Sequence, residues 1–240
     1  KLFSAGPGQI QGKKILGIIH KFVNIFKPDK LLIYQDIWAA EDFDMSLIQC
    51  KKYIYIPIHN EFVNDNDRRN LKFLPSFDKI ATFSRFGIEV LQTHGYYNAT
   101  FINHIIADIK VKQTRKELRK KYNISDDSFI CLIVGKVSRG DRKSYHEQLQ
   151  AFQKFSLNKD NCKLIIHTTN QKIEIITNII YTYNIQDKVV LTGNSVNTDM
   201  EIRELYALSD VLLCASKSEG FGMPMVEAQF TDLKVISNKC

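Results

Sequence analysis

The chain has 240 residues, of which 44% are hydrophobic and 25% are charged. These values are typical of a globular protein with a real core, folded as one large domain or two modest ones. The five cysteines are odd in number and have no CxxC spacing, which argues against a disulfide framework and a zinc site and favours a reducing, cytoplasmic compartment. No apolar run approaches the ~18 residues that span a bilayer, and no signal-peptide pattern opens the sequence.

The formal net charge is +7, and the pI is near 9.0. Either the composition is simply rich in Lys, Asn and Ile, or the surface binds an anionic partner such as a phosphorylated ligand or an anionic membrane. The densest basic cluster, residues 110–121, has no interleaved aromatic residues and is typical of a solvated helix. We therefore expect no nucleic-acid partner, whereas peripheral contact with a membrane surface stays open.

The first half of the sequence alternates helical and extended patterns. Apolar spacing predicts a helix over 13–26, which Lys27-Pro28-Asp29 ends. The elements expected after it are a strand over 30–36, a strand over 53–62 interrupted by Pro57, a strand over 79–84, a helix over 85–95 closed by Gly95, and a strand over 100–106.

The same alternation restarts after the charged segment. The strands expected there cover 128–136, 162–168, 188–193, 210–216 and 234–238. The helices expected between them cover 144–156, 171–183, 198–209 and 224–230, with Thr198 as an N-cap residue.

Strands separated by helices of this length predict parallel sheets built from βαβ units. The fold class is therefore α/β, with a Rossmann-like N-terminal domain over 1–112 and a Rossmann-like C-terminal domain over 113–240. We expect both domains to be incomplete, because the first shows about four strands and the second stops directly after a strand, with no helix to cover it. The sequence is interpreted as part of a longer chain.

Ligands of open parallel sheets bind at the carboxyl ends of the strands, which directs attention to three loops of the second half. The loop over 135–144 carries four basic residues ahead of a predicted helix, namely Lys136, Arg139, Arg142 and Lys143. Cationic side chains at such a position suit a phosphate group. A solvated basic loop explains the same pattern equally well.

The loop with the sequence SEGFGMP places two glycines between two acidic residues. Gly220 and Gly222 allow backbone amides to approach a ligand, and Glu219 and Glu227 can face one pocket. Carboxylates beside a phosphate act best as hydrogen-bond acceptors for hydroxyls. The pattern therefore predicts a ligand with phosphate in the middle and hydroxyls at each end, a nucleotide-sugar; a turn with a surface glutamate is the alternative.

The remaining polar features carry less information. The loop over 192–210 is an ordinary loop with a capped helix, which can add backbone contacts to a nucleotide base or ribose. The histidines near strand and helix ends have no metal-site spacing and are interpreted as structural; they are His59, His94, His104 and His167. A GxxxxGK[ST] loop is absent from the sequence, so kinase or NTPase chemistry has no anchor.

The segment SEGFGMPMVEAQFTDLKVIS, preceded by DVLLCAS, resembles the E-x7-E signature of retaining glycosyltransferases of the GT-B fold, in the large family-4 type known as glycosyl transferases group 1. FICLIVGKVSRGDRKSYHEQLQAF is similar to the part of that family that holds the donor diphosphate. KPDKLLIYQD, YIYIPIHNEF and FDKIATFSRFGIEVLQTHGY fit its first half. The resemblance implies two Rossmann-like domains that face a cleft.

The resemblance also implies roles for individual residues. The catalytic residues would be Glu219, which contacts the transferred sugar, and the pair Arg139 and Lys143, which neutralise the diphosphate leaving group. The residues that bind the donor would be Gly220, Phe221, Gly222, Met223, Glu227 on the ribose, Lys136 and Arg142. Enzymes of this type need no metal ion or other cofactor, because cationic side chains stabilise the departing phosphate.

The implied function is a hexosyltransferase that moves a sugar from a nucleoside-diphosphate sugar to a glycan, lipid-linked or small-molecule acceptor. Two alternatives remain: a non-catalytic relative that only binds the nucleotide-sugar, and a GT-B-fold epimerase or phosphorylase. The first alternative is motivated by a missing N-terminal loop, and the second shares the architecture. The sequence departs from the family pattern at two places. The run NHIIADI keeps His104 but lacks the usual glycine, and the N-terminal glycine-rich loop is not seen.

Overall fold

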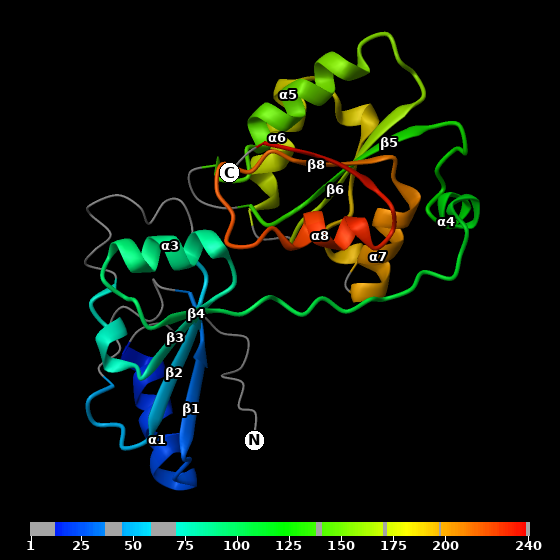
Figure 1. The fold of residues 1–240 in the computed structure, drawn as a ribbon. Helices are drawn as coiled ribbons and strands as arrows, with labels where there is room; N and C mark the ends of the chain where they lie inside the picture. The colour runs from blue at the N-terminus through cyan, green and yellow to red at the C-terminus, as the bar shows by residue number, and fades with distance from the viewer. Residues whose placement is uncertain are drawn as a thin grey trace. The chain divides into compact units, whose positions relative to one another are not determined.

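The computed structural model describes residues 13–36, 45–58, 71–137, 141–169, 172–196 and 198–238 (Figure 1). The chain divides into two compact units, Lys1–Ile105 and Ile106–Cys240. Residues 102–114 have no regular structure and join the last strand of the first unit to the first helix of the second. The sequence placed the division at 112/113, within this segment.

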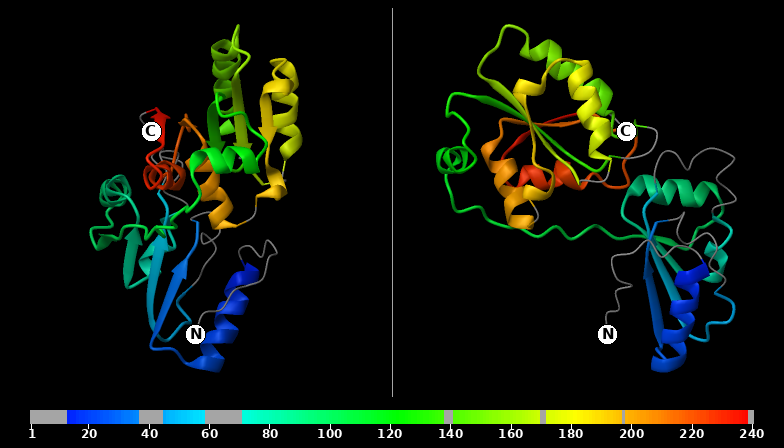
Figure 2. Two further views of the ribbon diagram at one scale, coloured as in Figure 1. Left: turned by 90° about the vertical axis from the view of Figure 1, so that its right-hand side faces the viewer. Right: turned by 180° about the vertical axis from the view of Figure 1, so that it is seen from behind.

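The first unit is a four-stranded parallel sheet in the order β1-β2-β3-β4 (Figures 1 and 2). Its elements are α1 (Lys13–Phe26), β1 (Lys30–Tyr34), β2 (Lys51–Ile56), a 3₁₀ turn (Leu74–Ser76), β3 (Lys79–Thr82), α3 (Arg85–Thr93) and β4 (Ala99–Phe101). The helix predicted over 13–26 is confirmed. Strand β2 ends directly before Pro57, which has no N–H for a sheet hydrogen bond.

The strand predicted over 100–106 is wrong in its length, because β4 covers only Ala99–Phe101. Its neighbour β3 ends at Thr82, since the Ser84 side chain caps α3 by accepting from the Gly87 N–H at 2.9 Å. The Ile102 N–H still donates to the Thr82 carbonyl at 3.0 Å. The apolar residues that follow have no partner strand in the described part of this unit, and Ile105 is 97% exposed.

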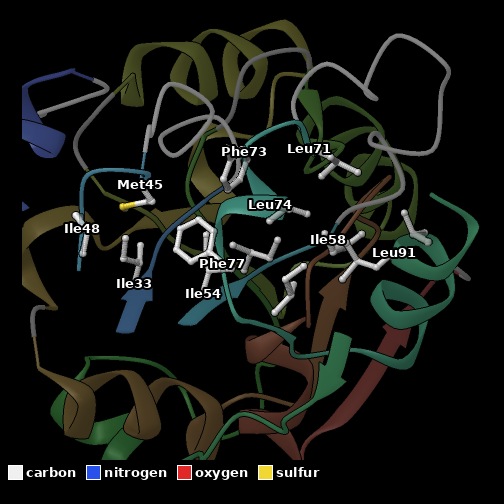
Figure 3. Packing of buried hydrophobic residues seen from close by; sticks show 13 residues of the cluster. Ile33, Met45, Ile48, Ile54, Ile58, Leu71, Phe73, Leu74, Phe77 and Leu91 are labelled. Carbon is white, nitrogen blue, oxygen red and sulfur yellow. The ribbon is translucent and has the colours of Figure 1, made fainter. Parts of the chain in front are cut away.

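The core of the first unit lies against one face of its sheet. Ile33, Ile54 and Ile80 on adjacent strands are buried and pack with Leu91 of α3. Figure 3 shows side chains of the segments 45–48 and 71–77, for which the sequence analysis had no element, filling the same cluster. Met45 and Leu74 are fully buried there. Connecting segments, one of which contains the 3₁₀ turn Leu74–Ser76, therefore cover part of this sheet face.

The second unit is a five-stranded parallel sheet in the order β7-β6-β5-β8-β9. Its strands are β5 (Phe129–Val134), β6 (Cys162–His167), β7 (Val189–Leu191), β8 (Val211–Cys214) and β9 (Lys234–Ser237). Its helices are α4 (Arg115–Lys121), α5 (Tyr145–Ser156), α6 (Ile173–Thr182), α7 (Asp199–Leu208) and α8 (Met223–Gln229), with 3₁₀ turns at Gln186–Lys188 and Gly193–Ser195. The predicted βαβ alternation is confirmed.

Helices cover both faces of this sheet, with α5 and α6 on one side and α7 and α8 on the other (Figures 1 and 2). Alternate residues of β5 point to opposite sides, as the pleat requires. Cys131 and Ile133 pack in the cluster with α5 and α6, whereas Ile130 and Leu132 pack in the cluster with α4, α7 and α8. Thr198 caps α7 in a capping box with Glu201, which confirms the predicted N-cap.

Helix α4 anchors the start of the second unit and is not the fully solvated helix that its charges predict. It begins after a capping box on Thr114, and Arg119 is buried. The Arg119 guanidinium donates to the Leu208 carbonyl at 3.2 Å and to Asp210 at 2.8 Å. Asp210 also accepts from the Ile130 N–H at 2.7 Å, so Arg119 ties α4 to the amino ends of two strands.

No helix in the described ranges has the length and apolar character needed to cross a membrane.

Candidate functional site

Two loops meet at the carboxyl edge of the second sheet. Strands β5 and β8 are hydrogen-bonded neighbours, with Cys131 opposite Val211, so the loops that follow them start side by side. The Lys217 N–H, after β8, donates to the Arg142 carbonyl, after β5, at 2.8 Å. The fold thus brings together the basic loop and the glycine loop that the sequence analysis selected separately.

An ion pair between Lys143 and Glu219 joins the two loops. The Lys143 Nζ donates to Glu219 Oε1, and the Arg142 guanidinium lies 3.4 Å from Oε2. The side chains of Lys143 and Glu219 are each only 12% exposed. Arg142 also donates to the Ser218 carbonyl, so it ties the start of the glycine loop to the basic loop.

The charge state of Glu219 follows from this environment. Burial by itself raises the pKa of its carboxyl, but hydrogen bonds from Lys143 and Ser216 and the charges of Lys143 and Arg142 outweigh it, so the net pKa lies below its ordinary value. Glu219 is therefore a carboxylate at neutral pH. It is suited to accept hydrogen bonds and unsuited to deliver a proton.

The basic loop holds Lys143 in a fixed position. Asp141 and Ser144, on either side of Arg142 and Lys143, have left-handed backbone with φ of 49° and 51°. Non-glycine residues adopt this conformation only when their surroundings impose it. The Asp141 side chain accepts from the Tyr145 N–H at 2.8 Å, and Gln148 donates to the Lys143 carbonyl at 2.7 Å. The strain therefore lies where the cations are presented.

The glycine loop needs its second glycine. Gly222 has φ +81° as the residue before α8, a backbone conformation that side chains disfavour. A Cβ at this position would also lie 2.3 Å from Met225 Cε. The tight turn sets Glu219 before α8 and Glu227 within it.

The second glutamate has two partners of its own from α7. The Tyr206 hydroxyl donates to Glu227 Oε2 at 2.8 Å, and Arg203 lies 3.5 Å from Oε1. Both partners are buried, while the Glu227 side chain is 20% exposed. Burial first, and the neighbouring Glu227 second, raise the pKa of Tyr206, so its hydroxyl keeps its proton and remains a donor.

The predicted site residues separate into three groups. Glu219, Lys143 and Arg142 are in mutual contact, Gly220, Phe221, Gly222 and Met223 form the turn beside them, and Glu227 lies in α8 with the α7 pair. Lys136 is exposed at the start of the basic loop, and Arg139 lies outside the described residues. The ligand contacts assigned to all of them remain predictions.

Sequence reasoning missed the residues that hold the glutamates in place. Arg203 and Tyr206 looked like ordinary positions of a capped helix, although their i, i+3 spacing puts them on one helix face. Ser216, which helps to lower the pKa of Glu219, had no motif to mark it. These contacts join residues that are distant along the chain, so no local sequence pattern predicts them.

The structural role of the histidines stays a prediction, although His94, His104 and His167 each contact neighbouring residues; His59 lies outside the described ranges. His167 Nδ1 lies 2.9 Å from Thr192 Oγ1, and His94 Nδ1 lies 2.8 Å from the Val90 carbonyl. The His104 ring packs on Phe83 with ring centroids 4.2 Å apart. Burial lowers the pKa of His104 and of His167. Among the described residues, no His, Cys, Asp and Glu side chains cluster as a metal site would require.

A groove of about 1140 Å³ lies elsewhere, along β8 and β9 beside α5, and reaches the amino end of β5. Phe129, Phe155 and Val211 are among its mostly apolar lining residues. None of the predicted site residues lines it. The convergence of polar groups between the two loops, and not this apolar groove, marks the candidate site.

Comparison with known proteins places this geometry in a family. Residues 114–240, just over half of the chain, match the family "Glycosyl transferases group 1". N-acetyl-alpha-D-glucosaminyl L-malate synthase of Bacillus anthracis is 26% identical over 140 residues, which cover 58% of this chain and 35% of that protein. An uncharacterized glycosyltransferase of Methanocaldococcus jannaschii is 28% identical over 130 residues, which cover 54% and 32%. The chain thus spans about a third of the length of these curated relatives.

Solved structures share the fold at low sequence identity. HepE of Anabaena in complex with UDP and glucose has a TM-score of 0.72 at 14% identity, covering 93% of this chain and 63% of that one. The pneumococcal O-GlcNAc transferase GtfA in complex with UDP and GlcNAc has a TM-score of 0.63 at 14% identity, covering 93% and 45%. The two parallel sheets, the family match and these neighbours agree: the chain belongs to the glycosyl transferases group 1 family and has the GT-B fold.

Proposed function

We propose that the full-length protein is a retaining glycosyltransferase that moves a hexose from a nucleoside-diphosphate sugar to a hydroxyl acceptor. The observation that carries the proposal is the buried contact of Lys143 and Arg142 with Glu219 beside the Gly222 turn. Cations and an ionised carboxylate on adjacent loops suit a ligand with an anionic end and a hydroxyl-bearing end. Complexes of the fold neighbours with UDP and glucose or GlcNAc make UDP-hexoses the first donors to test.

In the proposed reaction, the bond between the anomeric carbon and the diphosphate breaks while the acceptor oxygen bonds to the same face of the sugar, and the proton of the acceptor hydroxyl passes to the leaving diphosphate. Negative charge then grows on the leaving diphosphate oxygen. Lys143 has three N–H donors and engages Glu219 with one of them, so others can meet phosphate oxygens. Because Lys143 is already fixed, it stabilises that charge without reorganising, and the mechanism needs no metal ion.

Glu219 supplies the other half of the proposal. As a buried carboxylate it accepts hydrogen bonds from hydroxyls of the transferred sugar and favours the positive charge that develops at the anomeric carbon. Its negative charge also disfavours a phosphate at the same spot. Glu219 and Lys143 together therefore orient the donor with the sugar on one side and the diphosphate on the other.

The test uses full-length protein and a thermal-shift panel of UDP, ADP and GDP with their hexose conjugates. The conjugate that stabilises the protein most is then supplied with candidate acceptors, and the anomeric configuration of the product is read by NMR. Glu219→Gln and Lys143→Met are each expected to lower kcat by at least about a hundredfold, a size typical of removing one fixed charge-stabilising group. The matched control is Lys217→Met. Lys217 is an exposed lysine that lies two residues before Glu219, and this variant is expected to keep activity within about threefold.

Three results would contradict the proposal. Inversion at the anomeric carbon would exclude retention. Tight nucleotide binding without turnover of any donor would favour a non-catalytic relative. Unchanged activity of both Glu219→Gln and Lys143→Met would remove the assigned site.

A further inference from the structure

The carboxylate of Glu227 is held by contacts with α7 that no sequence motif describes. Its Oε2 accepts from the Tyr206 hydroxyl at 2.8 Å, and its Oε1 lies 3.5 Å from Arg203 Nη2. The same Nη2 donates to the Ala107 carbonyl at 3.3 Å. Ala107 belongs to the segment over 102–114 that leads into the second unit. One carboxylate is thereby tied both to α7 and to that segment.

Burying Arg203 costs free energy that packing alone does not explain. The Arg203 side chain is only 5% exposed, and its Nη1 has no hydrogen-bond partner among the described residues. A buried guanidinium with an unfilled donor costs free energy, and an apolar side chain of similar volume often stabilises a core as well or better. Its guanidinium also lies over the Tyr206 ring, 5.9 Å from the centroid. Arg203 and Tyr206 therefore act on Glu227 as a unit.

We infer that Arg203 and Tyr206 are positioning residues that fix the carboxylate of Glu227 so that it accepts the ribose hydroxyls of the donor nucleotide. This inference rests on the proposed function, because it takes Glu227 as the ribose contact. Each carboxylate oxygen has two lone pairs. One lone pair of each oxygen is directed at α7. The other lone pair of each oxygen is left to accept a hydrogen bond, so the carboxylate offers two fixed acceptors to two neighbouring hydroxyls. A carboxylate without these restraints turns about its terminal bonds and discriminates less.

The measurement is the ratio of two dissociation constants in full-length protein, by titration calorimetry. The probes are UDP, ADP and GDP, followed by the 2′-deoxy form of whichever binds most tightly. In the unmodified protein, the deoxy form is expected to bind about tenfold more weakly, as for loss of one hydrogen bond to a charged group. Tyr206→Phe and Arg203→Met are each expected to reduce this ratio to about threefold or less. Arg203→Lys, which keeps the charge, is expected to restore part of it.

Matched controls separate positioning from general damage. Tyr183→Phe removes a hydroxyl that contacts His146 at 2.6 Å, and Arg115→Met removes an ion pair to Asp210, at the opposite end of β8 from the site. Both controls are expected to keep the tenfold ratio. Tyr206→Phe deletes a single oxygen, so it answers the question even where Arg203→Met proves too unstable to purify.

The outcomes distinguish this inference from the proposed function. A ratio near one in the unmodified protein, or an unchanged ratio in Tyr206→Phe and Arg203→Met, would overturn the positioning role and leave the glycosyltransferase proposal standing. Binding of no nucleoside diphosphate by the unmodified protein would overturn both. A merely structural role predicts lower melting temperatures with the tenfold ratio intact, which also counts against the inference.

Discussion

Removing the Lys143 side chain tests the central ion pair through stability, without any substrate. Lys143→Met keeps most of the aliphatic part of the side chain, which passes close to Gly135. It leaves the Glu219 carboxylate, 12% exposed, with Arg142 at 3.4 Å as its charged partner. Removing one partner of a fully buried pair costs 3–5 kcal/mol, and the remaining partner reduces this, so we expect a loss of about 2 kcal/mol at neutral pH.

The pH dependence distinguishes this mechanism from simple loss of packing. The pKa of Glu219 is depressed from its ordinary value of 4.5, so its ionised form adds stability above that value and loses it as the pH falls through the folded-state pKa. Without Lys143, burial pushes the pKa of Glu219 upward, and the variant gains stability as the carboxyl is protonated. The gap between the two proteins should therefore be widest near pH 7.5 and clearly smaller near pH 5.

Thermal unfolding at several pH values measures the gap. A loss of about 2 kcal/mol corresponds to a shift of roughly 4–8 °C for a protein of this size. The double variant Lys143→Met with Glu219→Gln is expected to recover more than half of it, because no unpaired charge is left buried. Lys217→Met, whose lysine is 52% exposed beside Glu147, should shift the midpoint by less than about 2 °C. A gap that is constant with pH, or a double variant no better than the single one, would refute the reasoning.

Three further changes test the elements that support the site. Gly222→Ala should cost about 2 kcal/mol through its positive φ and its clash with Met225, and adding Met225→Ala should relieve only the clash, as melting temperatures will show. Arg119→Met should lower stability by about 3 kcal/mol in denaturant titration, whereas Lys116→Met on the same helix, whose side chain is 84% exposed, should be nearly neutral. Thr198→Ala should cost about 1 kcal/mol through loss of the α7 cap, and a neutral result would contradict the cap's role.

The sequence predicted most of what is local in this fold. Helix periodicity located α1 with its observed bounds, and the N-cap at Thr198 and the glycine after α3, with φ +88°, were read from residue type alone. Parallel sheets followed from the βαβ spacing. These successes share one cause: each depends on residues within a few positions of one another.

The errors involve partners that are distant along the chain. An apolar run after residue 101 looked like strand, but the neighbouring strand had already ended at Thr82. Arg119 looked solvated in a run of basic residues, but it is buried against Leu208 and Asp210, about 90 residues away. The partners of Glu227 were missed for the same reason. Charge and hydropathy are properties of a single residue, whereas its burial depends on which distant residues the fold packs against it.

Glu219 in the glycine loop and Glu227 in α8 are therefore held by different means, and the difference bears on how a donor would bind. Glu219 is neutralised by Lys143 and Arg142, which leaves this group of three charges with a net positive charge for a diphosphate. A diphosphate that shares Lys143 with Glu219 weakens the hydrogen bond from Lys143 to the carboxylate, and the sugar hydroxyls compensate for this loss. Glu227 is held by buried partners that no phosphate can reach in this way. Under the proposed function, the sugar and the diphosphate should thus bind cooperatively at Glu219, while the ribose contact at Glu227 is set before the donor arrives.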